Sequence, residues 1–271
     1  MKLSPIQVAP GVLGAARTML VTRRSMLRGG LGLLAGAAVG GLQDDLDRFS
    51  RVLDEPQAAP VVEPEPEPAP PPPPTEFRRG DAGDGVWALQ EALGRSGYWC
   101  GAPDGGFGHL TEQAVFAVQK AHGLGRDGIA GPLTLAAVET GYRPAPASGG
   151  DHMEVHLATQ LLLVVRGGAT AMVLNTSTGN GEPYTFQGGD YLAHTPTGDF
   201  AVWYTDGSGW RDGELGALYR PMFYDGNYAI HGSGSIPPWP ASHGCARIST
   251  AAMDMIWAQG MLGMGERVLV V

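Results

Sequence analysis

A proline-rich segment divides this chain of 271 residues into a part that can build a core and a part that precedes it. Residues 63–68 alternate Glu and Pro, and five consecutive prolines follow from Pro70. Because proline fixes φ and has no amide donor, this stretch favours extended polyproline II over a packed fold. At about 3.1 Å per residue, residues 54–76 span roughly 70 Å. We therefore interpret residues 42–76 as a Pro-rich disordered linker that acts as a spacer.

Residues 1–41 have the pattern of an export signal. They contain five basic residues and no acidic one, and residues 29–41 are built only of Gly, Ala, Leu and Val. A basic stretch before a short apolar one is typical of a secretory signal, and the apolar part is too short for a stable membrane span of about 20 residues. Residues 22–28 resemble the twin-arginine signal, with Met26 where Phe is commonest. A basic disordered tail is the alternative.

Charge and cysteine content exclude several classes of protein. The net charge of −9 argues against nucleic acid as the partner, because nucleic-acid binding requires a basic face. Two cysteines, Cys100 and Cys245, cannot build a disulfide scaffold or a four-cysteine zinc module. Away from the N-terminus there is no apolar run of about 18 residues, which excludes a polytopic membrane protein.

Residues 77–143 predict three short helices with a repeated turn. Val86, Leu89 and Leu93 lie three or four residues apart, a second helix begins near Thr111, and a third follows Pro132. Asp-Gly turns precede the second and third helices, 23 residues apart, at Asp104-Gly105 and Asp127-Gly128. The second residue of such a turn favours glycine, which tolerates positive φ.

These residues resemble the peptidoglycan-binding domain type 1 family. The resemblance is carried by the first helix, both Asp-Gly turns and the second helix, in which Val118 stands where the family usually has Phe. It implies a module that binds the cell wall at residues 77–143, and it assigns no contact residue.

Residues 152–271 predict a mainly β domain. An apolar strand over 155–165 turns at Gly167-Gly168 into a second strand at 171–174, as in a hairpin. Further strands are expected at 191–194, 199–205, 227–231 and 266–271. One helix is expected at 250–260, starting at Thr250 and ending at Gly260.

One stretch of this domain carries reactive side chains. His231-Gly232 ends a predicted strand, and a loop leads to Ser242-His243-Gly244-Cys245-Ala246-Arg247. A nearby imidazole helps a thiol to become a nucleophilic thiolate, and amides around Gly244 and Cys245 could hold an oxyanion. By residue type alone, Cys245 could equally be a buried inert thiol or a metal ligand.

Residues 153–271 resemble the L,D-transpeptidase catalytic domain (YkuD-like). The family carries His-Gly, a variable loop and Ser-His-Gly-Cys-x-Arg, which match His231-Gly232 and Ser242 to Arg247 here. The resemblance implies that Cys245 is the nucleophile and His231 the general base. It further implies that Gly232 orients His231, that Ser242, His243 and Gly244 shape the site and its oxyanion hole, and that Arg247 binds substrate or fixes the loop.

The resemblance also implies an overall organisation and a reaction. The fold is multidomain: a three-helix peptidoglycan-binding module and a β-sandwich-like catalytic domain (152–271) with one or more short helices. The enzyme releases the terminal D-Ala of a tetrapeptide stem and passes a cysteinyl thioester to a stem amine, which gives a 3→3 cross-link. No metal or organic cofactor is expected, carbapenem-type inhibitors are expected to react, and the protein is expected to be exported to the cell wall, periplasmic or secreted.

Several alternatives remain beside this interpretation. Water as the acceptor would make the protein an L,D-carboxypeptidase. A non-catalytic peptidoglycan-binding scaffold would carry the same fold without reacting. A zinc peptidase of the wall is disfavoured, because His152 and His156 are not accompanied by a zinc-binding His-Glu-x-x-His pattern. A papain-like endopeptidase usually places its cysteine before its histidine, and here His231 precedes Cys245.

Overall fold

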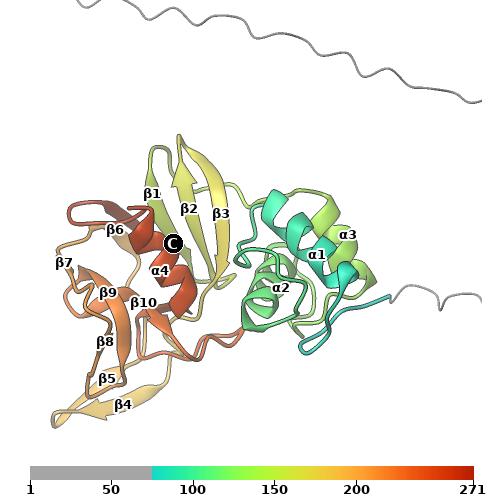
Figure 1. Ribbon diagram of the computed structural model, residues 1–271. Helices are drawn as coiled ribbons and strands as arrows, with labels where there is room; N and C mark the ends of the chain where they lie inside the picture. Colours follow the sequence, from blue (N-terminus) through green and yellow to red (C-terminus); the bar gives the residue numbers. More distant parts are fainter. Residues whose placement is uncertain (1–74) are drawn as a thin grey trace, which may run out of the picture. The chain divides into compact units, whose positions relative to one another are not determined.

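The computed structural model describes residues 75–271 (Figure 1). The predictions of an export signal at 1–41 and a spacer at 42–76 fall outside the described residues, apart from Thr75 and Glu76. The described part begins with the three predicted helices, α1 (Asp84–Arg95), α2 (His109–Ala121) and α3 (Pro132–Glu139). No helix within residues 75–271 is long and apolar enough to cross a membrane.

The repeated Asp-Gly turns are ordered by two equivalent glutamines, Gln90 on α1 and Gln119 on α2. Each is almost fully buried, and each uses its amide to bond the turn that follows its helix. Gln90 bonds to Asp104, Gly105, Gly106 and Thr111. Gln119 bonds to Asp127, Gly128, Ile129 and Thr134. The repeat in sequence is therefore a repeat of hydrogen bonding, in which a buried side chain satisfies turn donors and acceptors.

From His152 onward the chain builds two sheets, a separate hairpin and one helix (Figure 1). The first sheet has the order β3-β2-β1-β12-β6. The second has the order β11-β10-β9-β7, with β8 paired to β9. The hairpin is β4–β5, and the helix is α4 (Thr250–Ala258). The strands are β1 (His152–His156), β2 (Leu161–Arg166), β3 (Ala169–Asn175), β4 (Pro183–Phe186), β5 (Gly189–Leu192), β6 (Gly198–Ala201), β7 (Tyr204–Thr205), β8 (Trp210–Arg211), β9 (Leu218–Asp225), β10 (Tyr228–Ser233), β11 (Ala246–Ser249) and β12 (Arg267–Val270).

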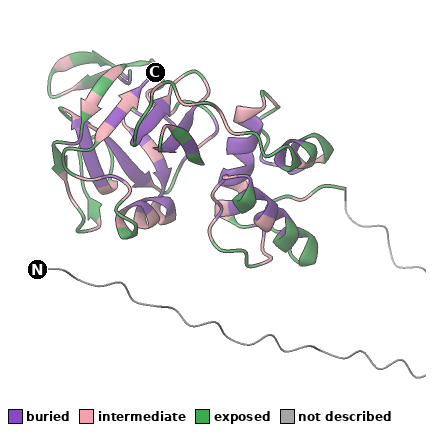
Figure 2. Ribbon diagram, turned by 90° about the horizontal axis from the view of Figure 1, so that it is seen from above, coloured by how far each residue is buried: buried purple, intermediate pink, exposed green. Residues whose placement is uncertain are grey.

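Strand β2 is buried on both of its faces. Leu161, Leu163 and Val165 join the core that the three helices form. Leu162 and Val164 point the other way, into the core shared with the second sheet and α4. Figure 2 shows these central strands as continuous buried stretches. The fully apolar run in the sequence is therefore the signature of a strand that is covered on both sides.

The prediction of one strand over 155–165 is wrong, because β1 ends at His156 and β2 starts at Leu161. Between them the chain turns at Gln160, which has a positive φ of 61°. The Gln160 side-chain amide donates to Leu157 O at 2.8 Å and fixes the turn. The two strands then pair antiparallel. Apolar residues over 155–165 predict that the segment is buried. They do not predict whether it forms one strand or two.

Three strands of the second sheet, β8, β9 and β11, are absent from the sequence-based prediction. β9 contains Pro221 and an Arg220 with a φ of 48°, both of which speak against a regular strand. β11 is four residues long and overlaps the motif around Cys245. The strand predicted at 199–205 is also divided, into β6 and β7. The predicted helix at 250–260 is confirmed as α4, although Ser249 caps it by accepting from the Ala252 amide at 3.1 Å.

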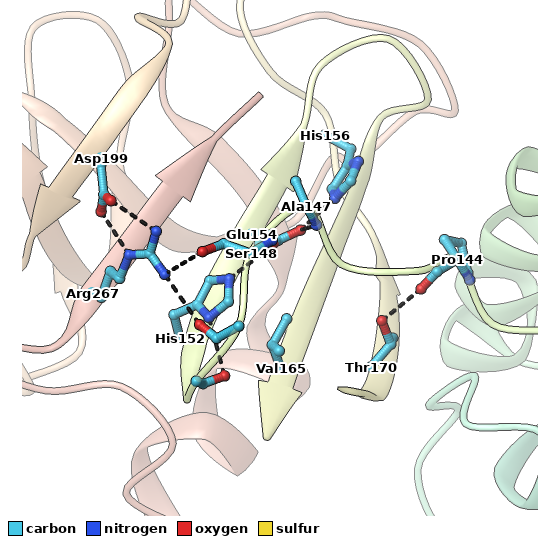
Figure 3. Close-up of polar contacts among 12 residues, drawn as sticks. Pro144, Ala147, Ser148, His152, Glu154, His156, Val165, Thr170, Asp199 and Arg267 are labelled. Atoms are coloured by element: carbon cyan, nitrogen blue, oxygen red, sulfur yellow. Dashed lines mark hydrogen bonds and ion pairs between the residues drawn. The ribbon is translucent and has the colours of Figure 1, made fainter. Parts of the chain in front are cut away.

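A fully buried carboxylate anchors the segment that leads from the helices into β1 (Figure 3). Glu154 accepts hydrogen bonds from the amides of Ala147 (2.9 Å) and Ser148 (3.0 Å). It also lies 2.6 Å from His152 Nε2 and 2.8 Å from His156 Nε2. Burial acts to raise the pKa of Glu154, but these four contacts together outweigh it and lower that pKa.

Arg267 extends this anchor to the neighbouring strands (Figure 3). Its guanidinium forms a two-point ion pair with Asp199 of β6, with both N–O distances 2.7 Å. The same group donates to Ser148 Oγ at 2.9 Å. Farther along, Thr170 Oγ1 donates to Pro144 O at 2.6 Å. The segment between the helices and β1 is therefore held along its length and does not form a free hinge.

We predict that Glu154→Gln lowers the free energy of unfolding at pH 7 by about 3 kcal/mol. The NH2 group of the glutamine would face a backbone N–H of Ala147 or Ser148, and two donors cannot bond each other. Since folding lowers the pKa of Glu154, its contribution is complete above the unfolded pKa of about 4.5 and is lost as the pH falls through the folded pKa. The difference between wild type and variant in urea unfolding should therefore shrink at acid pH. Exposed Glu182→Gln is the matched control, and equal effects of both substitutions would contradict this role of Glu154.

Candidate active site

Parallel pairing of β10 and β11 brings His231 and Cys245 to the same face of the second sheet. The register places Ile230 opposite Ala246 and His231 opposite Arg247. Cys245, directly before β11, therefore falls beside Ala229, two residues from His231. Because side chains alternate along a strand, His231, Cys245 and Arg247 all project from one face. The two predicted catalytic residues thus belong to one site.

Ser242 closes the turn that presents Cys245. Its hydroxyl donates to Cys245 O at 2.7 Å and accepts from the Gly244 amide at 2.9 Å. This second bond corrects the expectation that the Gly244 N–H is free to hold an oxyanion, because Ser242 already occupies it. Gly244 instead shapes the site: its φ is 142°, and a side chain there would collide with the ring of Tyr228.

His231 is buried and held in one tautomer. Its Nδ1 lies 2.9 Å from Gly232 O, and because a carbonyl can only accept, Nδ1 carries the proton. Burial lowers the pKa of His231 to about 4, and the hydrogen bond to Gly232 acts in the opposite direction. The charge of Arg247 also lowers this pKa. At neutral pH the imidazole is therefore uncharged, with an unprotonated Nε2 that can accept a proton.

The surroundings of Cys245 favour a neutral thiol. Burial raises the pKa of Cys245, although the Ala229 backbone and the charge of Arg247 act to lower it. The Sγ donates to Asn227 O at 3.6 Å, on the turn between β9 and β10. Within residues 75–271, Cys245 makes no hydrogen bond to His231. A raised thiol pKa beside a lowered imidazole pKa favours the uncharged pair over a thiolate–imidazolium pair.

Arg247 fixes the loop that leads into the site. Its guanidinium donates to Ala241 O at 3.1 Å, and in the described part of the chain it forms no ion pair with a carboxylate. Its backbone pairs with Ser177 in both directions. Burial lowers the pKa of Arg247, and the nearby Cys245 acts to raise it. The cation therefore lies where it can stabilise negative charge on Cys245.

His243 and the hairpin β4–β5 lie beside the turn. His243 is exposed, and its ring meets that of Tyr184 edge-on, with centroids 4.8 Å apart. On another side of the site, Trp203, Tyr204, Arg211, Phe223 and Asn227 line a cleft of about 230 Å³. The backbone carbonyl of Asn227 also accepts from the Cys245 thiol, so the cleft and the thiol share this residue.

Sequence reasoning missed three residues that build the site. Asn227 and Tyr228 contact Cys245 and Gly244 from the β9–β10 turn, and no local pattern marks them. Thr195 Oγ1 donates to Gly244 O at 2.7 Å and accepts from Gly179. Thr195 lies in a Thr-Pro-Thr-Gly stretch, and its role follows only from its contact with the turn. No group of three potential metal ligands occurs in the described range.

Comparison with known proteins decides the family. Residues 82–138 match the putative peptidoglycan binding domain, and residues 150–270 match the L,D-transpeptidase catalytic domain. The chain is 46% identical to an L,D-transpeptidase of Xylanimonas cellulosilytica, whose crystal structure superposes with a TM-score of 0.71 over 74% of this chain and 100% of that one. This chain belongs to the L,D-transpeptidase family. The parallel pair β10–β11, with His231 and Cys245, is therefore part of the catalytic domain of an enzyme that acts on the cell wall.

Other relatives are more distant. An L,D-transpeptidase of Stackebrandtia nassauensis is 24% identical, with a TM-score of 0.41 over 74% of this chain and 97% of that one. The N-acetylmuramoyl-L-alanine amidase CwlM of Mycobacterium tuberculosis is 43% identical over 56 residues, which are 21% of this chain and only 14% of CwlM.

We predict that Cys245 is alkylated slowly by iodoacetamide at pH 7 and increasingly fast above pH 9, because burial raises the pKa of Cys245 above its ordinary value of 9.0. Cys100 should stay unmodified in the folded protein, since its thiol is buried and its pKa is raised to about 11. Mass spectrometry of the alkylated peptides measures both rates, with Cys245→Ala as the control. Fast alkylation of Cys245 at pH 6 would instead reveal a resting thiolate.

Proposed function

We propose that this L,D-transpeptidase forms 3→3 cross-links in peptidoglycan, with a tetrapeptide stem as donor and a side-chain amine of a neighbouring stem as acceptor. The observation that carries the proposal is the parallel register that sets Cys245 on the same face of the sheet as a neutral His231 with an unprotonated Nε2. A neutral base next to a neutral thiol suits a nucleophile that is activated only when an acyl donor is bound.

In the first half-reaction, the Cys245 thiol gives its proton to His231 Nε2 while the sulfur attacks the carbonyl of the third stem residue. A tetrahedral oxyanion forms, and the Cys245 amide is the candidate donor for it, because the Gly244 amide is engaged by Ser242. When the peptide bond breaks, His231 returns the proton to the departing amine of D-Ala. The product is a thioester between the stem and Cys245.

In the second half-reaction, the acceptor amine loses a proton to His231 and attacks the thioester carbonyl. The C–S bond then breaks, and the proton returns to the sulfur, which restores the neutral pair. The cleft lined by Asn227, whose carbonyl accepts from the Cys245 thiol, is the candidate place for one of the two stems. Arg247 supports the charge that develops at Cys245 and keeps the loop at Ala241 in place.

The helical module is proposed to bind peptidoglycan and so to keep the enzyme at its substrate. Action outside the cytoplasm, in the periplasm or as a secreted protein, follows from this substrate, and the export signal at 1–41 remains our proposal for how the chain arrives there. Water as the acceptor would give L,D-carboxypeptidase activity from the same thioester.

Acylation by a carbapenem tests the nucleophile. Incubation of the full chain should add the mass of one intact carbapenem, since opening of the lactam ring releases no leaving group. Cys245→Ala should gain nothing, and Cys100→Ala, which removes the other cysteine, should react like wild type. A folded wild type that binds peptidoglycan but is never acylated would favour the non-catalytic scaffold.

Removal of the base tests the mechanism. We predict that His231→Ala lowers the yield of cross-linked dimer from disaccharide-tetrapeptide by about 10² to 10⁴-fold, which is the usual contribution of a positioned general base. His109→Ala, at the start of α2, is the control and should leave the yield unchanged. Chromatography of the products also separates dimer from tripeptide, which water would give. Equal losses in both variants would mean that His231 is not the base.

A further inference from the structure

The loop between His231 and Cys245 is held from outside by side chains that bond its backbone. We call residues 234–244 the catalytic loop. Asn175 Nδ2 donates to Ile236 O at 3.1 Å, Arg126 Nη1 to Pro238 O at 2.9 Å, and Ser177 Oγ to Trp239 O at 2.8 Å. Ser177 belongs to the catalytic domain, but Arg126 lies between α2 and α3 in the helical module.

The second contact from the helical module is a buried lysine. Lys120 on α2 is 3% exposed, and its ammonium donates to Gln160 O (2.8 Å), to Thr176 O (2.9 Å) and to Asn175 Oδ1. Three acceptor oxygens match the three donors of an ammonium group. Burial, with the nearby Arg126, acts to lower the pKa of Lys120, whereas the three acceptor oxygens around Nζ favour its charged form.

Lys120 determines which way the Asn175 amide points. Because the ammonium takes Oδ1, the Nδ2 group must face the opposite side, where it donates to Ile236 O and to Gln113 Oε1 (2.6 Å) on α2. The Ile236 carbonyl can only accept, so it favours the same orientation of the amide from the other side. The bond from Asn175 to the catalytic loop is therefore supported by a residue of the helical module, which holds the amide oxygen.

Displacement of the catalytic loop would reach the nucleophile directly. Near its end, the loop contains Ala241 and Ser242, whose amides both donate to Thr178 O, at 3.0 and 2.9 Å. Ser242 is the residue that closes the turn around Cys245. A shift of about 1 Å in a reacting atom can slow catalysis about 100-fold, so modest loosening of this loop has a measurable effect.

We propose that Lys120 and Arg126 are positioning residues of the transpeptidase: from the helical module they hold the catalytic loop, and through it Cys245, in its reactive place. The module is then a structural part of the active site as well as a wall-binding unit. This inference rests on the proposed function, because it takes Cys245 as the group that is acylated.

The test measures carbapenem acylation rates of full-chain variants by intact mass. Arg126→Ala removes one loop contact at the surface and should be acylated about tenfold more slowly than wild type. Arg126→Lys keeps a donor for Pro238 O and should recover most of the rate. Arg79→Ala is the matched control, since Arg79 is an exposed arginine of the same module whose only side-chain contact within the described residues is Glu112. Lys120→Met should be slower still.

Thermal unfolding and sedimentation with insoluble peptidoglycan separate the possible causes. We expect Arg126→Ala to unfold at the wild-type temperature and to bind peptidoglycan normally, so that only acylation changes. Acylation of folded Arg126→Ala at the wild-type rate would overturn the inference, as would a loss that Arg126→Lys fails to restore. A wild type that is not acylated at all would overturn the proposed function itself, which is a distinguishable result. If Lys120→Met does not fold, the arginine variants still decide.

Discussion

Burial of the strand Leu161–Arg166 on both faces is the constraint on which the rest of the molecule depends. One face of β2 completes the core of the three helices, and the other completes the core between the two sheets. Removing either partner would expose a row of leucine and valine side chains to water, at roughly 25 cal/mol for each Å² of apolar surface. The helical module and the catalytic domain, which are separate units in sequence, are therefore joined by a shared hydrophobic strand.

That shared strand explains why polar contacts between the two units can be buried and specific. Lys120 extends from α2 over the end of the first sheet to carbonyl oxygens at Gln160 and Thr176. Glu154 and Arg267 fasten the connecting segment on the other side of β1 (Figure 3). A buried charge tolerates little movement, because its partners must stay in place. The joint between module and catalytic domain is thus specified by both packing and hydrogen bonds.

The electrostatics of the site fit the proposed nucleophile, which stays uncharged until an acyl donor binds. His231 is held neutral by burial, and Cys245 is held as a thiol for the same reason. A resting thiolate would be exposed to oxidation outside the cytoplasm, because susceptibility follows thiolate character. Arg247 supplies a positive charge that favours the thiolate only when a proton acceptor is in place. A substrate that excludes water from the site strengthens this effect.

Local pattern was enough to predict the three helices, the repeated turns, α4 and the motif residues from His231 to Arg247, because each depends on neighbours in the chain. The prediction of one strand over 155–165 overlooked the polar residues Thr159 and Gln160, which interrupt the apolar run where the chain turns. Local pattern could not predict β9, whose Pro221 and Arg220 are tolerated only because the flanking strands hold them. The sequence by itself thus predicted which side chains carry the chemistry. Only the tertiary structure decided that the Gly244 amide donates to Ser242 and that the Cys245 thiol donates to Asn227 O. It also decided that Lys120 and Arg126 support the catalytic loop. Those contacts join residues far apart in the chain, and their geometry exists only after the two cores have formed around β2.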